Sequence, residues 1–521
     1  MKKIFTLAIL IVVLLLLEVS VSRAATYYYV RPATGDCNYN GDGTTQNCAS
    51  GIGEAGAWKG FSNVIWGGSG VGAGDTLYLG GGKTYLSEML SIRASGSSGL
   101  PIIISVYGEG QAVVDGQNSI QFLIRGNGND YITIDGVRGA AIDGNYDYGI
   151  KLQNPSDNGI CVYDYSGPQN WLITRIECYG ESLIGSDYHG GIYMGGGANI
   201  IEVSYSWIHG PIKSYSERSQ QWHGTGMKIW NTPNGTNFIG VKLHHNKVEY
   251  MYHDGIATGS NSSIYNNYVK YVHGSGHSDS ILIQSGSYAK IYNNYIESND
   301  QNIYLDNLLS STQQYIYIFN NVSYAWNGYG VVPHAEVGDW QYLYIFNNTF
   351  YDQSNSGASI RQGSGGKHLY NTYIKNNYFG PSSNGFYRVN ISNSNDIFDM
   401  DYNCYSSTGY SYPDLINIAS TAYTLNELKQ LLNFENNGLV GTPTFADIIN
   451  RDFRPISSDT MLINAGVDLS SFLDVNGDVL FTTDKNGIIR TNWDIGAYEY
   501  IASGPLPDTT PPSTPMGLTV Q

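Results

Sequence analysis

Charged residues are scarce in this chain of 521 residues. Only 14% of the residues are charged, against about a quarter in an ordinary soluble protein, and the formal net charge is −17. This composition excludes a coiled coil or a helical bundle, which would be rich in Ala, Glu, Lys and Leu. The acidic balance excludes binding to nucleic acid through its phosphates, because such binding requires basic patches.

Cysteine is also rare, with five residues, and none of them belongs to a Cys-x-x-Cys pair. This argues against a disulfide-dense scaffold and against a structural zinc cluster. We expect Cys37 to pair with Cys48 across a short polar loop and Cys161 to pair with Cys178, which leaves Cys404 over. Disulfides of this kind fit an oxidising compartment.

Only one long hydrophobic run is present. Ile4–Leu17 is apolar at all but one position, follows two lysines and precedes the small residues Ser22 and Ala24. This pattern is typical of a secretory signal peptide over residues 1–24, and the run is too short to span a bilayer. We therefore predict a secreted or cell-surface protein with no membrane span after cleavage.

Glycine (63 residues) and tyrosine (44 residues) are abundant, and 41% of the chain is hydrophobic. That much hydrophobic content can bury a large core, which argues against disorder. The glycines have no three-residue period, which excludes collagen. The composition favours an all-β protein of short strands and many turns.

The clearest pattern is an internal repeat. A short alternating strand that ends in Asn recurs at intervals of 21 to 29 residues. The repeats end at Asn246, Asn267, Asn294, Asn321, Asn348 and Asn377. Each is followed by a second short strand, such as Gly255–Thr258 or Asn302–Leu305.

A parallel β-helix explains this repeat. If each repeat is one coil, equivalent residues stack about 4.8 Å apart, so Ile and Val form inward ladders and Asn side chains hydrogen-bond from turn to turn. Helical repeats would need a period of 3.6 and a β-propeller would need hairpin turns. We also predict one short helix over Thr424–Phe434 that covers the end of the solenoid, because Thr424 and Glu427 form a capping box.

Three segments resemble the secreted right-handed parallel β-helix proteins of the pectin-lyase-like superfamily. Gly74–Tyr85 is similar to the opening coil of many members, and Asp474–Asp478 and Arg490–Tyr500 are similar to the closing tail of bacterial surface members. The resemblance implies a single right-handed β-helix over about residues 26–500. It implies no one reaction, because this fold hosts lyases, hydrolases, epimerases and non-enzymatic adhesins.

The predicted organisation follows from the repeat. Residues 25–115 form an N-terminal cap and the first coils, and residues 116–400 form the central coils. Residues 401–502 form the last coils, the short helix and the tail. Residues 503–521 are rich in Pro, Ser and Thr and resemble a linker that enters a fibronectin type III module.

Chemistry-bearing residues gather before and on the second strands. Because coils stack, residues just before five successive second strands form a stripe, and alternate strand residues, starting with Lys151, face outward. The candidate catalytic residues are His223, Lys228, His253, Asp254, His277 and Asp279. The candidate substrate-binding residues are His189, Tyr193, Asp300, Tyr304, Asp306, His334 and Arg361.

These residue types permit acid–base chemistry on a sugar polymer. Paired carboxylates on adjacent coils would hydrolyse a glycosidic bond, whereas His or Lys228 would remove a proton beside a uronate carboxylate. Tyr252–Gly255 partly resembles the His-Asp-Gly portion of the mannuronan epimerase signature. The alternative is that His and Asp only satisfy backbone groups in turns.

We therefore predict a secreted, monomeric carbohydrate-active protein that binds a polysaccharide along the β-helix and acts as a polysaccharide lyase, glycoside hydrolase or uronate epimerase. The alternative is a non-catalytic cell-surface or adhesive β-helix protein. Calcium is the one candidate cofactor, because Asp36–Gly43 and Asp474–Asp478 carry spaced oxygen ligands. In both segments a turn without metal is the competing interpretation.

Overall fold

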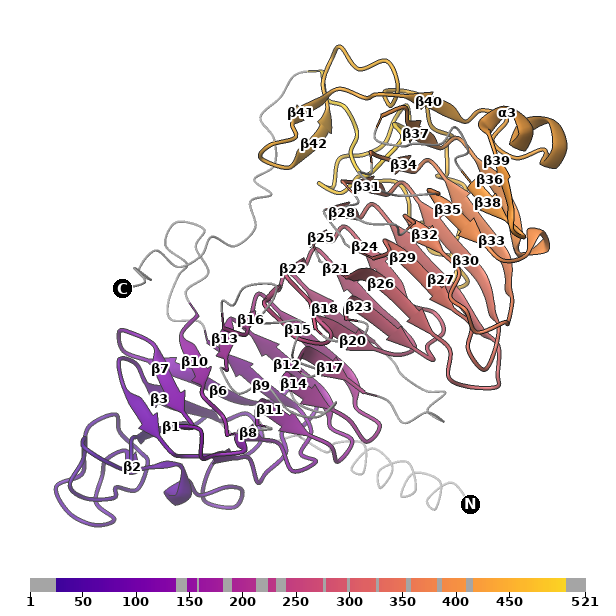
Figure 1. Ribbon diagram of the computed structural model, residues 1–521. Coiled ribbons are helices and arrows are strands. Elements are labelled where there is room, and N and C mark those ends of the chain that lie inside the picture. The colour runs from indigo at the N-terminus through magenta and orange to yellow at the C-terminus, as the bar shows by residue number, and fades with distance from the viewer. Residues whose placement is uncertain are drawn as a thin grey trace, which may run out of the picture.

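Short alternating strands pair in parallel from coil to coil and build three long sheets (Figure 1). The computed structural model describes residues 25–136, 148–156, 159–180, 190–211, 224–230, 240–274, 278–297, 300–324, 328–352, 358–381, 387–408 and 416–502. The predicted signal peptide and the predicted linker of residues 503–521 lie outside these residues.

Each coil contributes one strand to each sheet in turn. Sheet 1 contains β1 (Tyr27–Arg31), β2 (Trp58–Lys59), β3 (Thr76–Gly80), β6 (Ile102–Tyr107), β9 (Ile132–Asp135), β12 (Gln169–Thr174), β15 (Asn199–Ser204), β18 (Val241–His244), β21 (Ser262–Tyr265), β24 (Lys290–Tyr292), β27 (Gln313–Phe319), β30 (Trp340–Phe346), β33 (Leu369–Lys375) and β36 (Ile397–Asp401). Sheet 2 contains β4 (Thr84–Leu86), β7 (Ala112–Asp115), β10 (Ile150–Gln153), β13 (Ile176–Tyr179), β16 (Trp207–His209), β19 (Lys247–Glu249), β22 (Tyr268–Lys270), β25 (Tyr295–Glu297), β28 (Val322–Tyr324), β31 (Thr349–Tyr351), β34 (Tyr378–Phe379), β37 (Cys404–Ser406) and β40 (Leu439–Gly441).

Sheet 3 contains β5 (Leu90–Ser91), β8 (Phe122–Arg125), β11 (Ile160–Asp164), β14 (Gly190–Met194), β17 (Thr225–Ile229), β20 (Ile256–Thr258), β23 (Asp279–Gln284), β26 (Gln301–Asp306), β29 (Val331–His334), β32 (Ile360–Arg361), β35 (Val389–Ile391), β38 (Ile416–Ile418) and β39 (Thr421–Tyr423). Outside the sheets lie β41 (Phe445–Asp447), β42 (Asp452–Pro455), η1 (Phe61–Asn63), η2 (Ser394–Asp396), α3 (Leu425–Glu427) and η3 (Leu428–Leu432). All pairings within the sheets are parallel except the one between β38 and β39. The architecture is therefore the predicted right-handed parallel β-helix, since crossovers between parallel strands are right-handed in nearly all proteins.

The core consists of ladders of identical apolar residues. On sheet 1, Ile264, Ile291, Ile318, Ile345 and Ile374 stand in register on five successive strands, and all are fully buried. Burying one such side chain contributes about 1.5–3 kcal/mol. The ladder explains why the repeat is strict at these positions, because every coil must fill the same interior volume.

A second ladder follows the turn between sheets 1 and 2. Side-chain amides donate to one another in a column formed by Asn246, Asn267, Asn294, Asn321, Asn348, Asn377 and Asn403, at 3.0 to 3.1 Å per step. The column ends at Glu435, whose Oε1 accepts from Asn403 Nδ2 at 2.6 Å. The residue before each of the central Asn positions has a left-handed backbone, such as Asn293 at φ 57°, which Asn tolerates well. The predicted Asn ladder is thereby confirmed.

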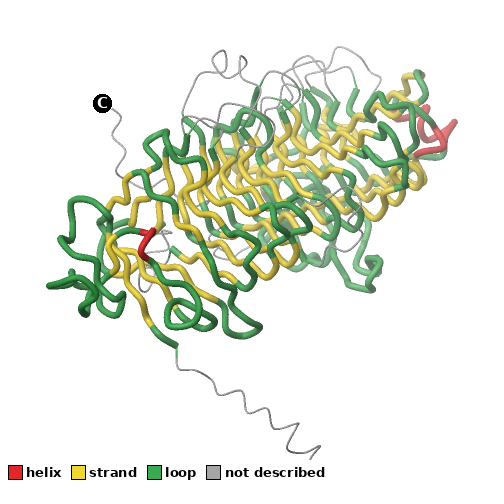
Figure 2. The backbone as a smooth tube through the Cα atoms, turned by 90° about the horizontal axis from the view of Figure 1, so that it is seen from below, coloured by secondary structure: helices red, strands yellow, loops and turns green. Residues whose placement is uncertain are grey.

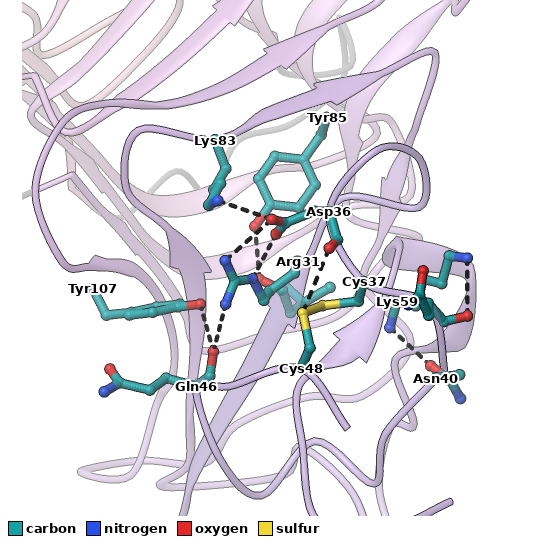
Figure 3. Close-up of a disulfide and its surroundings, with 12 residues drawn as sticks. Arg31, Asp36, Cys37, Asn40, Gln46, Cys48, Lys59, Lys83, Tyr85 and Tyr107 are labelled. Carbon is teal, nitrogen blue, oxygen red and sulfur yellow. Dashed lines mark hydrogen bonds and ion pairs between the residues drawn. A yellow bond between two sulfur atoms is a disulfide. The ribbon is translucent and has the colours of Figure 1, made fainter. Parts of the chain in front are cut away.

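The two ends of the solenoid are closed differently. At the first end, Cys37 and Cys48 form the predicted disulfide, and Asp36 lies 2.9 Å from Lys83 Nζ and also pairs with Arg31 (Figure 3). Asp36 is therefore used in ion pairs within a disulfide-closed loop, which favours the interpretation without calcium.

At the other end, the predicted helix begins at Thr424 with its capping box and continues through α3 and η3 (Figure 2). Leu428 is fully buried against the core, and Leu425, Leu432 and Phe434 pack on the same cluster. The helix thus covers the last coil, as predicted. The second predicted disulfide, Cys161–Cys178, joins sheets 3 and 2, and Cys404 is a buried free thiol.

Residues 445–502 fold back along the outer faces of sheets 1 and 2. On sheet 2, Phe445 and Phe453 pack against the rings of Tyr324 and Tyr351, which places β41 and β42 beside β28 and β31 (Figure 1). On sheet 1, Phe481 packs edge-on against Phe346 with ring centroids 5.1 Å apart. The Asp474 carboxylate lies 2.7 Å from Lys290 Nζ and accepts hydrogen bonds from the backbone N–H groups of Asn476 and Asp478. The Asp474–Asp478 segment therefore also fits the interpretation as a turn.

No helix among the described residues is long and apolar enough to cross a bilayer.

Candidate functional site

The described site residues lie on or beside neighbouring strands of sheet 3. Tyr193, Lys228, Ala257, Leu282, Tyr304 and Val332 stand in register along this sheet. The predicted outward row is thus present from Tyr193 onward. Its first predicted member is wrong: Lys151 belongs to β10 of sheet 2, where its Nζ binds Glu177 at 2.7 Å. Three predicted residues, His189, His223 and His277, lie outside the described residues.

The first half of the site, which we call the upstream cluster, consists of His253, Asp254, His273, Asp279 and Asp300. These residues occupy the coils that lead into β20, β23 and β26. His253 Nδ1 lies 2.8 Å from an Asp254 carboxylate oxygen. One coil further on, His273 Nδ1 lies 2.6 Å from an Asp300 carboxylate oxygen. The structure thus contains two His–Asp pairs on neighbouring coils.

The two members of the first pair differ in exposure. The Asp254 side chain is 1% exposed and the His253 side chain 28% exposed, and Asp279 is fully buried. Of these three groups, only the imidazole is partly accessible from outside. The Asp254 carboxylate lies at ion-pair distance from Nδ1, where an acidic partner favours one tautomer and one orientation of an imidazole.

The protonation of His253 depends on its neighbours. Burial by itself would lower the pKa of His253. The Asp254 and Asp279 carboxylates outweigh burial and hold the pKa of His253 above its usual value. The charge of Lys228 lowers the pKa of His253. Three predicted catalytic residues, Asp254, Asp279 and Lys228, thus influence the protonation of one imidazole.

His273 was not predicted as a site residue. It lies six residues before β23, whereas the predicted stripe contains only residues immediately before each second strand. A signal is nevertheless present: Tyr271-Val272-His273 repeats Tyr250-Met251-Tyr252 one coil later, and the His273 N–H donates to the Met251 carbonyl at 2.9 Å. Stacking the two loops, rather than the strands alone, would have placed His273 beside the cluster.

The second half of the site, which we call the downstream cluster, consists of Tyr304, Asp306, His334 and Glu336. Asp306 and His334 are in register at the ends of β26 and β29. His334 Nδ1 lies 3.2 Å from Asp306 Oδ1 and 2.7 Å from the Tyr304 hydroxyl. Burial first, and then the charges of Asp306 and Asp279, raise the pKa of Tyr304, so its hydroxyl stays protonated. Glu336 was not predicted, because it follows the strand in a loop.

An apolar strip separates the two clusters. Ala257, Leu282, Val332 and the ring of Tyr304 pack into one buried group on the outer face, with Tyr329 against it. The Arg361 guanidinium lies 4.2 Å from the centre of the Tyr329 ring. Since a strand rises about 3.3 Å per residue, β23 separates its two ends by about 16 Å. This side of the coil therefore has titratable groups at both edges and buried apolar side chains between them.

The sequence matches no protein-family model and no curated protein. Several solved structures resemble the chain at low identity, among them the following three. The A-module of a mannuronan C-5 epimerase from Azotobacter vinelandii aligns over 71% of this chain and 87% of its own, at 12% identity and a TM-score of 0.42. A family 6 polysaccharide lyase from Pseudopedobacter saltans aligns over 76% and 96%, at 16% identity and a TM-score of 0.43. A surface adhesin of Streptococcus pneumoniae aligns over 74% and 88%, at 10% identity and a TM-score of 0.41. Similarities this low assign no activity to the chain.

Proposed function

We propose that this protein is secreted and modifies a polysaccharide by acid–base chemistry on the outer face of sheet 3. The observation that carries the proposal is the partly exposed imidazole of His253, whose Nδ1 lies 2.8 Å from the buried Asp254 carboxylate. A positioned imidazole of this kind is the commonest general acid or base in enzymes. Lys228, which influences the His253 pKa, supplies a positive charge in the same place.

The burial of Asp254 and Asp279 favours one of the candidate reactions. Hydrolysis of a glycosidic bond needs two carboxyl groups that flank the bond. Asp254 and Asp279 are both fully buried, so neither can approach a glycosidic oxygen. Proton transfer at a carbon beside a uronate carboxylate needs only a base and a nearby positive charge, which His253 and Lys228 supply. The proposed substrate is therefore a uronate polymer, and the reaction is an elimination or an epimerisation.

The test is a panel of uronate and neutral polysaccharides, incubated with the protein without its signal peptide. Three readouts separate the reactions: ultraviolet absorbance of an unsaturated uronate for elimination, proton NMR for epimerisation, and reducing ends for hydrolysis. His253→Ala should abolish any product. The matched control is His368→Ala, since His368 also pairs with a buried aspartate, Asp396, at 3.0 Å but stands in another part of the coil.

Two results would contradict the proposal. Release of reducing ends without unsaturated product would favour hydrolysis, and full activity in His253→Ala would remove His253 from the reaction.

A further inference from the structure

The downstream cluster contains three potential metal ligands on two neighbouring coils. One ligand atom each from Asp306, His334 and Glu336 lies within 4.8 Å of the other two. The group is the only one of its kind among the described residues. It is separate from the upstream cluster to which the proposed reaction is assigned.

The spacing of the first two ligands already fits a small metal ion. Bonds of about 2.0 Å at tetrahedral angles place ligand atoms about 3.3 Å apart. His334 Nδ1 and Asp306 Oδ1 are 3.2 Å apart. A Glu336 carboxylate oxygen lies within 4.8 Å of the other two ligand atoms, and the Glu336 side chain is exposed. An exposed side chain is free to adjust about its own bonds when an ion binds.

The imidazole is held in place by its surroundings. Gly363 packs so closely on the His334 ring that an added Cβ would lie 2.4 Å from Cδ2. The Trp340 indole N–H donates to the His334 carbonyl at 3.1 Å. Because the ring and the backbone are both fixed, His334 loses little freedom when it binds an ion.

The charge of the group also favours a cation. Two carboxylates lie beside a single imidazole, and among the described residues neither Asp306 nor Glu336 forms an ion pair with Lys or Arg. A divalent ion would balance these charges. An imidazole ligand favours a transition metal over Ca²⁺, because Ca²⁺ takes oxygen ligands.

We propose that Asp306, His334 and Glu336 bind one divalent transition-metal ion, of which Zn²⁺ is the best fit to one nitrogen and two carboxylate ligands. Three protein ligands leave a coordination position open for water or a substrate oxygen. The site lies at the downstream edge of sheet 3, so a bound ion would face the same surface as the apolar strip.

The experiment uses the metal alone. Chelator-treated protein is titrated with Zn²⁺ by calorimetry, and with Co²⁺ while its visible absorption is recorded. We expect one ion per chain and an increase in the melting temperature. His334→Ala and Glu336→Gln should each weaken Zn²⁺ binding by about tenfold or more. Since Glu336 is exposed, its substitution tests the site without disturbing the fold.

The matched control is His368→Ala. His368 and Asp396 form a His–Asp pair like that of His334 and Asp306 but belong to no group of three ligands among the described residues. This variant should bind Zn²⁺ as the unmodified protein does. The proposal is wrong if the unmodified protein shows no saturable Zn²⁺ or Co²⁺ binding, if Ca²⁺ binds in preference to Zn²⁺, or if Glu336→Gln and His334→Ala bind Zn²⁺ normally.

Discussion

The outer faces of sheets 1 and 2 differ from that of sheet 3, although the three sheets share the same coils. Residues 445–502 hydrogen-bond or pack onto sheets 1 and 2, for instance through Val475 on Tyr317 and Ala497 on Thr349. Among the described residues, no hydrogen bond or ion pair joins this segment to a strand of sheet 3. Residues 445–502 therefore leave sheet 3 uncovered, and the partly exposed His253 lies at its upstream edge.

The outward residues explain the difference. On sheet 1, Tyr317 and Tyr344 stack at 5.0 Å and continue as an aromatic column that Leu469, Phe472 and Phe481 cover. An aromatic column left open would form a large apolar patch. On sheet 3 the apolar strip is short and ends in His–Asp pairs at both edges. The covered faces thus contribute stability, whereas sheet 3 carries the proposed site.

The largest expected effect concerns His253 at the proposed site on sheet 3. His253→Ala should lower kcat/KM on the responsive polysaccharide by about 1000-fold, within the range for loss of a general acid or base. Its urea midpoint should also fall, because the buried Asp254 carboxylate loses its ion-pair partner, but the protein should stay folded under the assay conditions. Steady-state kinetics and urea unfolding on the same preparation check both statements. Unfolding of the variant under the assay conditions would make His253 a structural residue.

The next effect tests a covered face. Phe481 is 2% exposed between Phe319, Phe346 and Phe472. Phe481→Ala should lower the free energy of unfolding by about 3 kcal/mol, because it leaves a cavity among these rings. Activity of the folded protein should be unchanged. If Phe481→Ala instead abolished activity at full stability, the assignment of stability to the covered faces and of activity to sheet 3 would be wrong.

A smaller effect concerns the Asn ladder at the turn between sheets 1 and 2. Burial raises the pKa of Glu435 to about 7, while hydrogen bonds from Tyr405 and Asn403 oppose the rise. The folded protein therefore binds more protons than the unfolded one between the ordinary Glu value and pH 7, so stability falls as pH rises through this window. The loss should be roughly 2–3 kcal/mol.

Unfolding curves at several pH values check this effect. Glu435→Gln cannot titrate, so the difference between its pH dependence and that of the unmodified protein isolates the carboxyl group. Identical pH dependence in the two proteins would show that Glu435 does not titrate with folding.

The smallest expected effect concerns the charges around His253 on sheet 3. Lys228 lowers the pKa of His253 and Asp254 raises it. If His253 acts as a base, activity rises with pH through its pKa. Lys228→Met should then shift this rise in activity to higher pH by about half a pH unit, and Asp254→Asn should shift it to lower pH. Shifts in the same direction in both variants would contradict the proposed electrostatics.

Much of the fold could be predicted because the signal is local and repeated. Asn294, Asn321 and Asn348 follow one another at equal spacing, and stacked coils turn equal spacing into contact. The capping box at Thr424 and both disulfides are likewise short-range patterns. The predicted row on sheet 3 follows from the same repetition, as the pairing of Leu282 with Tyr304 shows.

The errors arise where repetition is broken. Lys151 was placed on the wrong sheet, because strands of sheets 2 and 3 have similar alternation and only the stacked neighbour, Glu177, distinguishes them. His273 and Glu336 stand in loops of irregular length, where counting residues does not give position. His273 pairs with Asp300, which is 27 residues away in sequence, and Glu336 lies near Asp306, which is 30 residues away. Only the stacking of the coils reveals these neighbours.

The amino-acid sequence by itself determined the β-helix, its inward ladders and the general side on which His and Asp gather, because these depend on a period that every coil repeats. The tertiary structure alone decided which imidazole is exposed, which carboxylates are buried and which faces residues 445–502 cover. The contact of Arg490 with Asn320, 170 residues apart, shows the physical reason. Which faces are covered depends on how residues 445–502, which do not repeat, pack across many coils. No local sequence pattern predicts that packing.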